Sequence, residues 1–363
     1  METKPMQQPK VVEDYLSDKF KPDQNNLHLI RLIAAIAVIY GHSYAVTMEG
    51  GADFINRNLG FGFTGGLAVD AFFVISGFLV TASVMKGDWI FFITSRALRI
   101  FPALWACLLL TAFVFGPLLA TGPYDWSAAL DYFWRLATLQ QFMLFIPGLF
   151  TGLRDQAVNG VLWSVLIEAE MYFWTLVLFA SGILRRRAIF NTLFFMTLVA
   201  GYFSPGGVVL GYGATDRHVM LLYVIGAFFW INRDIIRINS IGICLCILLG
   251  ALTQGTPKFE YAYLLILPYL VFSLATGLKI PWFDNVDYSY GVYLWGWPIQ
   301  QSILLLYPAM TVVENQLIAI PLALFAGAAS WHFIERPALR HKRAVSERIR
   351  SPFRAKPLAQ TVP

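Results

Sequence analysis

The sequence has little charge for its length. Only 13% of its 363 residues are Asp, Glu, Lys or Arg, whereas about a quarter of a soluble domain is charged. Hydrophobic residues make up 57% of the chain, including 30 Phe and 11 Trp, and the mean hydropathy is +0.60. So few polar side chains cannot cover a water-exposed surface. The composition therefore excludes a disordered protein and an ordinary cytosolic enzyme, and it predicts a protein that crosses the membrane several times.

Cysteine is also scarce. The three cysteines, Cys107, Cys244 and Cys246, lie inside apolar runs, and none belongs to a Cys-x-x-Cys pair. The sequence therefore offers no disulfide framework, redox motif or zinc site. His332 and Glu335 are spaced like metal ligands, but two ligands are too few, so we expect no metal site. A phosphate-binding glycine loop and a G-x-S-x-G nucleophile motif are missing too.

Long apolar stretches, by contrast, run through most of the chain. A spanning helix needs about 20 mainly apolar residues. The stretches that meet or approach this length are 27–48, 63–85, 99–120, 161–184, 188–204, 217–232, 238–253, 261–279, 288–308 and 316–335. Residues 126–150 hold scattered charges, and we expect an interfacial or re-entrant segment there. The fold class predicted is an all-α polytopic bundle of about ten transmembrane helices.

The distribution of Lys and Arg predicts how this bundle is oriented. With both termini cytoplasmic, 21 of the 27 basic residues fall on the cytoplasmic side and 5 on the outer side, in agreement with the positive-inside rule. The predicted regions are a polar cytoplasmic tail (1–26) without a cleavable signal peptide, a transmembrane domain (27–337) and a basic cytoplasmic tail (338–363). We expect the basic tail to face lipid headgroups, and we expect no nucleic-acid partner.

Polar side chains within the apolar stretches are the first functional candidates. A charge at the middle of the membrane costs about 2.5–3.5 kcal/mol on insertion scales. Arg31 and His42 are 11 residues apart, which places them on one helix face about 16 Å apart. The alternatives are a snorkelling arginine and a structural histidine. Asp70 is expected at a depth similar to that of His42, where its carboxylate would fix the His42 tautomer. The alternative for Asp70 is a contact with a backbone amide.

Further candidates lie in the later stretches. Ser164, Glu168 and Tyr172 are spaced by four residues and predict one polar stripe, unless Glu168 is a structural carboxylate. Arg96 and Arg99 could hold a phosphate by charge-assisted hydrogen bonds, although positive-inside anchoring explains them too. Tyr290 is a weaker candidate for a substrate contact, because aromatic belts explain most of its surroundings.

These residues together resemble the acyltransferase-3 family of membrane O-acyltransferases, over about residues 27–337. The matching pieces are Arg31 with His42, Asp70 followed by Ala-Phe-Phe-Val-Ile-Ser-Gly-Phe-Leu, Arg96-x-x-Arg99 before Pro102, Leu162-Trp163-Ser164 with Glu168 and Tyr172, Ser289-Tyr290 before Tyr293-Leu294-Trp295, and Glu335-Arg336-Pro337.

The resemblance implies ten spans in the inner (plasma) membrane with cytoplasmic ends. It implies transfer of an acyl group, commonly acetyl, from cytoplasmic acyl-CoA to a hydroxyl of a cell-surface polysaccharide or lipid-linked glycan. The acyl-CoA would be a substrate, and no permanently bound cofactor is expected. With the residue chemistry, the resemblance gives His42 the role of base or acyl carrier, and Asp70 would orient His42. A proton-coupled transporter or flippase of a sugar or lipid intermediate is the alternative.

The resemblance also assigns binding roles. Donor binding falls to Arg31, Arg96 and Arg99, and Glu168 with Tyr172 would hold acceptor hydroxyls or shuttle a proton. Further substrate contacts are assigned to Ser164 and Tyr290. One departure is Gly296, where many members of the family have a histidine. Because the chain ends soon after the last apolar stretch, all of the chemistry is expected within the membrane domain.

Overall fold

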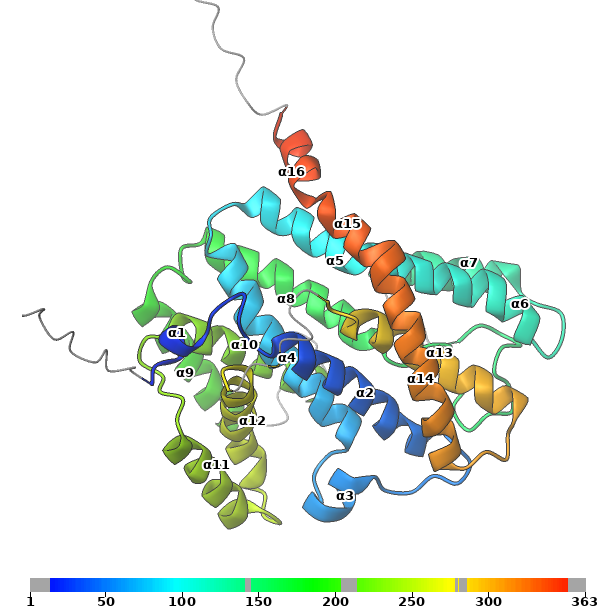
Figure 1. Cartoon of the computed structure of the whole chain (residues 1–363), viewed down its shortest axis with the longest axis horizontal. Coiled ribbons are helices and arrows are strands. Elements are labelled where there is room, and N and C mark those ends of the chain that lie inside the picture. The colour runs from blue at the N-terminus through cyan, green and yellow to red at the C-terminus, as the bar shows by residue number, and fades with distance from the viewer. Residues whose placement is uncertain (1–13, 141–144, 204–213, 278–279, 281–285, 352–363) are drawn as a thin grey trace, which may run out of the picture.

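A computed structural model describes residues 14–140, 145–203, 214–277, 280 and 286–351 (Figure 1). Residues 1–13 and 352–363, the outer parts of the two predicted tails, lie outside the described residues. Within the described ranges every regular element is a helix, and only two isolated β-bridges occur. The all-α prediction is confirmed.

Helices occupy all ten of the predicted ranges. They are α2 (Leu27–Val46), α4 (Thr64–Val84), α5 (Trp89–Leu110), α8 (Leu162–Ala180), α9 (Arg187–Phe203), α10 (Ala214–Ile231), α11 (Ser240–Thr253), α12 (Phe259–Ala275), α13 (Ser289–Leu306) and α14 (Val312–Ser330). Shorter elements are α1 (Leu16–Lys19), α3 (Phe54–Leu59), α6 (Gly116–Leu119), α7 (Trp126–Ala137), α15 (Arg336–Arg340) and α16 (Lys342–Arg350), with π-helical turns at Thr111–Phe115 and Trp331–Glu335.

Among the described residues, five continuous helices are long and apolar enough to cross a membrane. They are Leu27–Val46, Thr64–Val84, Trp89–Leu119, Leu162–Ala180 and Val312–Arg350. The chain is therefore a membrane protein with several apolar helices, and the ten-span count and its orientation stay predictions. The segment around α7 is a helix of 12 residues, which is shorter than a span requires.

Helix α5 begins ten residues earlier than the predicted start at residue 99. Its N-cap residue Asp88 accepts a hydrogen bond from the Phe91 backbone N–H at 3.0 Å. A side-chain acceptor at this position satisfies one of the orphan N–H groups of the first turn. Helix α14 likewise begins early, at Val312, because Thr311 and Glu314 form a capping box. Hydropathy alone finds apolar residues and misses these caps.

Helices α2, α4 and α13 form the centre of the bundle, with α8, α10 and α14 around them (Figure 1). Helices α4 and α10 touch backbone to backbone, since a Cβ on Gly77 would come within 1.9 Å of the Tyr223 carbonyl oxygen. A Cβ on Gly226 would come within 2.1 Å of the Val74 carbonyl oxygen. Such close approach between helices in a membrane requires small residues.

Candidate active site

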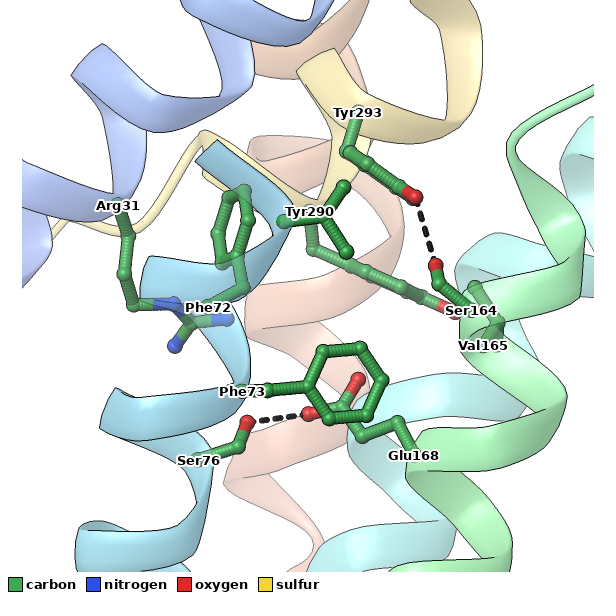
Figure 2. A pocket seen from close by; sticks show the side chains of 10 residues that line it. Arg31, Phe72, Phe73, Ser76, Ser164, Val165, Glu168, Tyr290 and Tyr293 are labelled. Carbon is green, nitrogen blue, oxygen red and sulfur yellow. Dashed lines mark hydrogen bonds between the residues drawn. The ribbon is translucent and has the colours of Figure 1, made fainter. Parts of the chain in front are cut away.

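A polar cavity of about 30 Å³ lies between α2, α4, α8 and α13. Figure 2 shows Arg31 beside Phe72, Glu168 facing Ser76, and Ser164 facing Tyr293 across this space. The volume is room for about two water molecules. The cavity therefore brings Arg31 of α2 together with Ser164 and Glu168 of α8, residues that the sequence had singled out in two separate apolar stretches.

The predicted polar stripe on α8 is present. Glu168 Oε1 accepts hydrogen bonds from Ser76 Oγ at 2.5 Å and from Tyr172 Oη at 2.7 Å. Ser164 Oγ lies 2.6 Å from Tyr293 Oη. These bonds connect the face of α8 to α4 and α13, so the stripe is packed into the bundle.

A second space of about 30 Å³, the arginine cavity, continues from the polar cavity. Four residues line both spaces: Arg31, Ser76, Glu168 and Tyr290. The predicted donor residues Arg96 and Arg99 line the arginine cavity and not the polar cavity. The Tyr290 hydroxyl donates to the Ile100 carbonyl oxygen at 3.1 Å.

An ion network closes one side of the arginine cavity. Arg31 and Arg99 both donate to Asp287 Oδ2, at 2.9 and 2.7 Å, and Arg99 also donates to Glu335 Oε2 at 3.1 Å. The Asp287 side chain is 5% exposed and that of Glu335 is 1% exposed. Ser289 and Ser330 donate to the other carboxylate oxygens. Charges this deeply buried are tolerated because each is paired and hydrogen-bonded.

Arg96 differs from Arg99 in its partners. Its guanidinium lies 5.6 Å from the centre of the Tyr172 ring, and its Nε is buried without a hydrogen-bond partner. In the part of the chain that the structure describes, Arg96 forms no ion pair with a carboxylate. The two arginines of the predicted anion site are thus unequal, since Arg99 is neutralised by two acids and Arg96 keeps its charge available.

Both arginine positions open onto a much larger space of about 670 Å³, which we call the vestibule. Of the described residues, six Lys and Arg side chains line it, against one carboxylate, that of Asp287. The six are Arg31, Lys86, Arg96, Arg99, Arg233 and Lys342. The buried Ser95 Oγ and Arg96 Nε have no partner there. A wide basic space with unsatisfied polar atoms is suited to a large anionic ligand.

His42 lies farther along α2 and lines none of these three cavities. Its Nδ1 is 2.8 Å from the Val38 carbonyl oxygen, which can only accept, so Nδ1 carries the proton. Nε2 of the neutral ring is then a free base. The ring packs edge-on against Trp297 at 5.0 Å and Phe63 at 5.5 Å between centroids. Trp297 is one turn from Tyr293 of the polar cavity, so α13 links the cavity to His42.

The predicted dyad of His42 and Asp70 was wrong. Asp70 Oδ2 accepts from His218 Nε2 at 3.0 Å and from Tyr263 Oη at 2.7 Å, and His42 bonds to its own helix. The helix register explains the difference: Gly41 packs against Gly65, so Asp70 lies about six residues, or 9 Å, deeper than His42. The sequence does not predict this offset, because the path of the loop between α2 and α4 determines how deep each helix starts.

Gly296 sits where α13 approaches α2 closely. A Cβ at this position would come within 2.6 Å of Ile39 Cγ1. One turn later, Gln300 donates to the Ile39 carbonyl oxygen at 3.0 Å and to Asn315 at 2.9 Å. Unless Ile39 shifts, there is no room for a side chain at position 296. The close packing of α13 on α2 therefore requires glycine here, where many members of the family have a histidine.

Sequence reasoning missed several members of the site. Asp287 was missed because it lies just before the predicted apolar stretch 288–308. Two buried arginines nevertheless require an acidic partner. Ser76 lies within the motif that follows Asp70, but the sequence assigned it no role, and His218 carried no spacing pattern; the tertiary contacts reveal both. Among the described residues, no three His, Cys, Asp or Glu side chains gather as a metal site requires.

Comparison with known proteins relates the chain to one family. A sequence profile of a family described as "Acyltransferase domain" matches residues 24–333. A protein named O-acetyl transferase, from Shigella phage Sf6, is 29% identical over 84% of this chain and 93% of its own length. No solved structure matches.

Two further relatives extend the comparison. O-acetyltransferase OatA of Staphylococcus aureus is 26% identical over 90% of this chain, which spans only 58% of the length of OatA. Nodulation protein 10 of Rhizobium leguminosarum bv. viciae is 27% identical over 87% of this chain and 94% of its own length.

Proposed function

Because this chain belongs to the acyltransferase family and is a membrane O-acetyltransferase, we propose that it transfers an acetyl group from acyl-CoA to a hydroxyl of a cell-surface polysaccharide or lipid-linked glycan. The proposed location is the inner (plasma) membrane. The names of the phage O-acetyl transferase and of OatA support acetyl transfer to oxygen. The classes of donor and acceptor are proposals for this chain.

The vestibule is the observation that carries the choice of donor. Coenzyme A is a large, phosphate-rich anion, and six cations face a single carboxylate in this space. Arg96, with its unpartnered Nε, would donate charge-assisted hydrogen bonds to phosphate. Arg31 lines the vestibule and both small cavities, so it stands where the thin pantetheine arm would leave the vestibule.

The reacting end of the donor would then pass the polar cavity toward His42. The distance from Arg31 to His42 is about 16 Å along α2. Ser164, Tyr290 and Tyr293 line the way. Glu168, held by Ser76 and Tyr172, would position acceptor hydroxyls or shuttle a proton. The polar cavity does not reach His42, and Tyr293 and Trp297 pack between the two. These side chains would therefore have to change rotamer to let the acetyl group pass.

His42 would act as the base. Its Nε2 takes the proton of the acceptor hydroxyl, the hydroxyl oxygen attacks the thioester carbonyl carbon, and the carbon–sulfur bond breaks. The coenzyme A thiolate then takes up the proton. In the second form, Nε2 itself attacks the thioester carbonyl carbon, the carbon–sulfur bond breaks and coenzyme A leaves as the thiolate. The acceptor hydroxyl oxygen then attacks the acyl-imidazole carbonyl, the carbon–nitrogen bond breaks to restore Nε2, and the hydroxyl proton passes to the thiolate. The hydrogen bond to Val38 fixes the tautomer for both forms.

Replacement of His42 tests the proposal. The His42→Ala variant in purified membranes should lose acetyl transfer from acetyl-CoA while keeping its thermal stability. His332→Ala is the matched control, because His332 is exposed, bonds to Tyr288 and lines none of the cavities described above. Wild-type rates in His42→Ala would overturn the base assignment.

Sealed vesicles of known orientation test the crossing of the acetyl group. Acetyl-CoA should serve only from the cytoplasmic face, and acetylated product should appear only on the other. Mass spectrometry of surface polysaccharide from a deletion strain would identify the acceptor by its lost acetyl mass. Efficient transfer with both substrates on the cytoplasmic side would move the acceptor to the inner leaflet.

A further inference from the structure

A basic recess of about 630 Å³ lies beside the vestibule, at the chain's last two helices. Its lining includes Arg336, Arg340, Lys342 and Arg343, and no carboxylate among the residues that the structure describes. Arg336, Arg340 and Arg343 are spaced by four and three residues, which places them on one face of the helical segment. Within the described residues, none of these four cations forms an ion pair with a carboxylate.

The recess and the vestibule are continuous. Trp331, Leu339 and Lys342 line both spaces. Trp331 is 8% exposed, and its Nε1 is buried without a hydrogen-bond partner. A buried N–H donor without an acceptor is costly, so a ligand with an acceptor atom at this junction would relieve that cost.

The recess is held in place by contacts to α5. Arg350 donates to both carboxylate oxygens of Asp88, at 2.7 and 2.6 Å. This contact keeps the pKa of Asp88 below its usual value, so the pair is ionised at neutral pH. Lys342 lies 5.8 Å from the centre of the Phe91 ring. In Figure 1, α16 accordingly runs on from α15 past the beginning of α5. The basic residues are therefore fixed beside the vestibule, and the predicted contact of the basic tail with lipid headgroups stays a prediction.

We propose that this basic recess, with Trp331 at its edge, binds the nucleotide end of the acyl-CoA donor. Arg340 and Arg343 would hold the ribose phosphate, and the Trp331 indole would stack on or donate to the adenine. The inference rests on the proposed acyl-CoA donor and adds where its far end lies. If the thioester is directed toward Arg31, the nucleotide end of the donor lies at the part of the vestibule remote from the polar cavity. The recess adjoins the vestibule through Trp331, Leu339 and Lys342.

A series of shortened donors tests this placement in wild-type protein, reconstituted in phosphatidylcholine nanodiscs. Acetyl-CoA, acetyl-dephospho-CoA, which lacks the ribose phosphate, and acetyl-pantetheine, which lacks the nucleotide, should show stepwise lower kcat/KM. In Arg340→Gln/Arg343→Gln, KM for acetyl-CoA should rise about tenfold, and KM for acetyl-pantetheine should not change. The variant should then no longer distinguish acetyl-CoA from acetyl-dephospho-CoA.

The control variant is Arg348→Gln, which removes one positive charge from α16, as Arg343→Gln does, but at a position that lines neither space. It should keep wild-type discrimination among donors. As a second probe of the recess, which carries no acyl group, adenosine 3′,5′-bisphosphate should inhibit wild type competitively against acetyl-CoA. Its inhibition constant should rise about tenfold in the double variant. Arg340→Gln alone should give an intermediate effect.

The outcomes separate this inference from the donor proposal. Unchanged discrimination in the double variant overturns the inference and leaves the donor intact. Equal losses for all three donors, reversed by changing the content of anionic phosphatidylglycerol, would mean that the recess binds lipid headgroups, which also overturns it. No transfer by wild type from any of the three donors would overturn the donor proposal and the inference together.

Discussion

Arg99 and Asp287 form a hydrogen-bonded ion pair of 2.7 Å across 188 residues of sequence. Arg31 shares the same carboxylate oxygen at 2.9 Å. The pair therefore ties α5 and α2 to the residue that precedes α13 by two positions. Arg31 and Arg99 line both the vestibule and the arginine cavity, so the geometry of the proposed donor path depends on this junction.

Replacement of Asp287 by Asn should destabilise the protein strongly. It leaves two buried guanidinium groups short of a carboxylate, and breaking such a pair costs about 3–5 kcal/mol. The thermal unfolding midpoint in detergent measures the effect. Asp88→Asn is the control, because its pair with Arg350 is exposed and worth about 1 kcal/mol or less. Equal midpoints for the two variants would contradict a structural role for Asp287.

The two arginines of the sequence motif should behave differently on replacement by Gln. Arg96→Gln should raise KM for acetyl-CoA about tenfold or more, because one charge-assisted hydrogen bond is worth about 1.5–3 kcal/mol, with little change in stability. Arg99→Gln should lower the unfolding midpoint, because Asp287 and Glu335 lose their shared cation. Donor KM and thermal midpoint, measured on both variants, test this. The same pattern in both would show that their different partners do not matter.

Glu168→Gln should separate the charge of this residue from its hydrogen bonds. The amide oxygen can still accept from Ser76 and Tyr172, so the protein should fold normally. If the carboxylate moves a proton, kcat should fall by about 10²–10⁴. Ser76→Ala removes one donor and should reduce kcat only severalfold. A glutamine variant with wild-type kcat would remove Glu168 from the chemistry.

Asp70 and His218 should act as one structural unit. Asp70→Asn and His218→Ala should each lower the unfolding midpoint, and the double variant should lose less than the sum of the two, because the shared contact is lost once. The pH profile of kcat should keep its shape in Asp70→Asn, since His42 makes no bond to Asp70. Additive losses in the double variant, or a shifted profile, would argue against the observed pairing.

The sequence predicted the elements of the fold well for a physical reason. A segment of about 20 apolar residues is required to cross the lipid core. Within one such segment, an α-helix forms all of the backbone hydrogen bonds that water cannot supply there. Helices therefore occur in all ten predicted ranges. The start of α5 was missed because a capping side chain at Asp88 is a local hydrogen bond that hydropathy does not record.

The sequence by itself also determined the polar stripe of Ser164, Glu168 and Tyr172, since spacing of four residues fixes a common face within one helix. Contacts between helices were decided only by the tertiary structure. Close approach of Gly41 to Gly65 sets the register that separates Asp70 from His42, and Asp287 determines that Arg99 is neutralised while Arg96 keeps its charge. Rotation and register between helices depend on side-chain packing from distant parts of the chain, and no periodicity within a single helix encodes them.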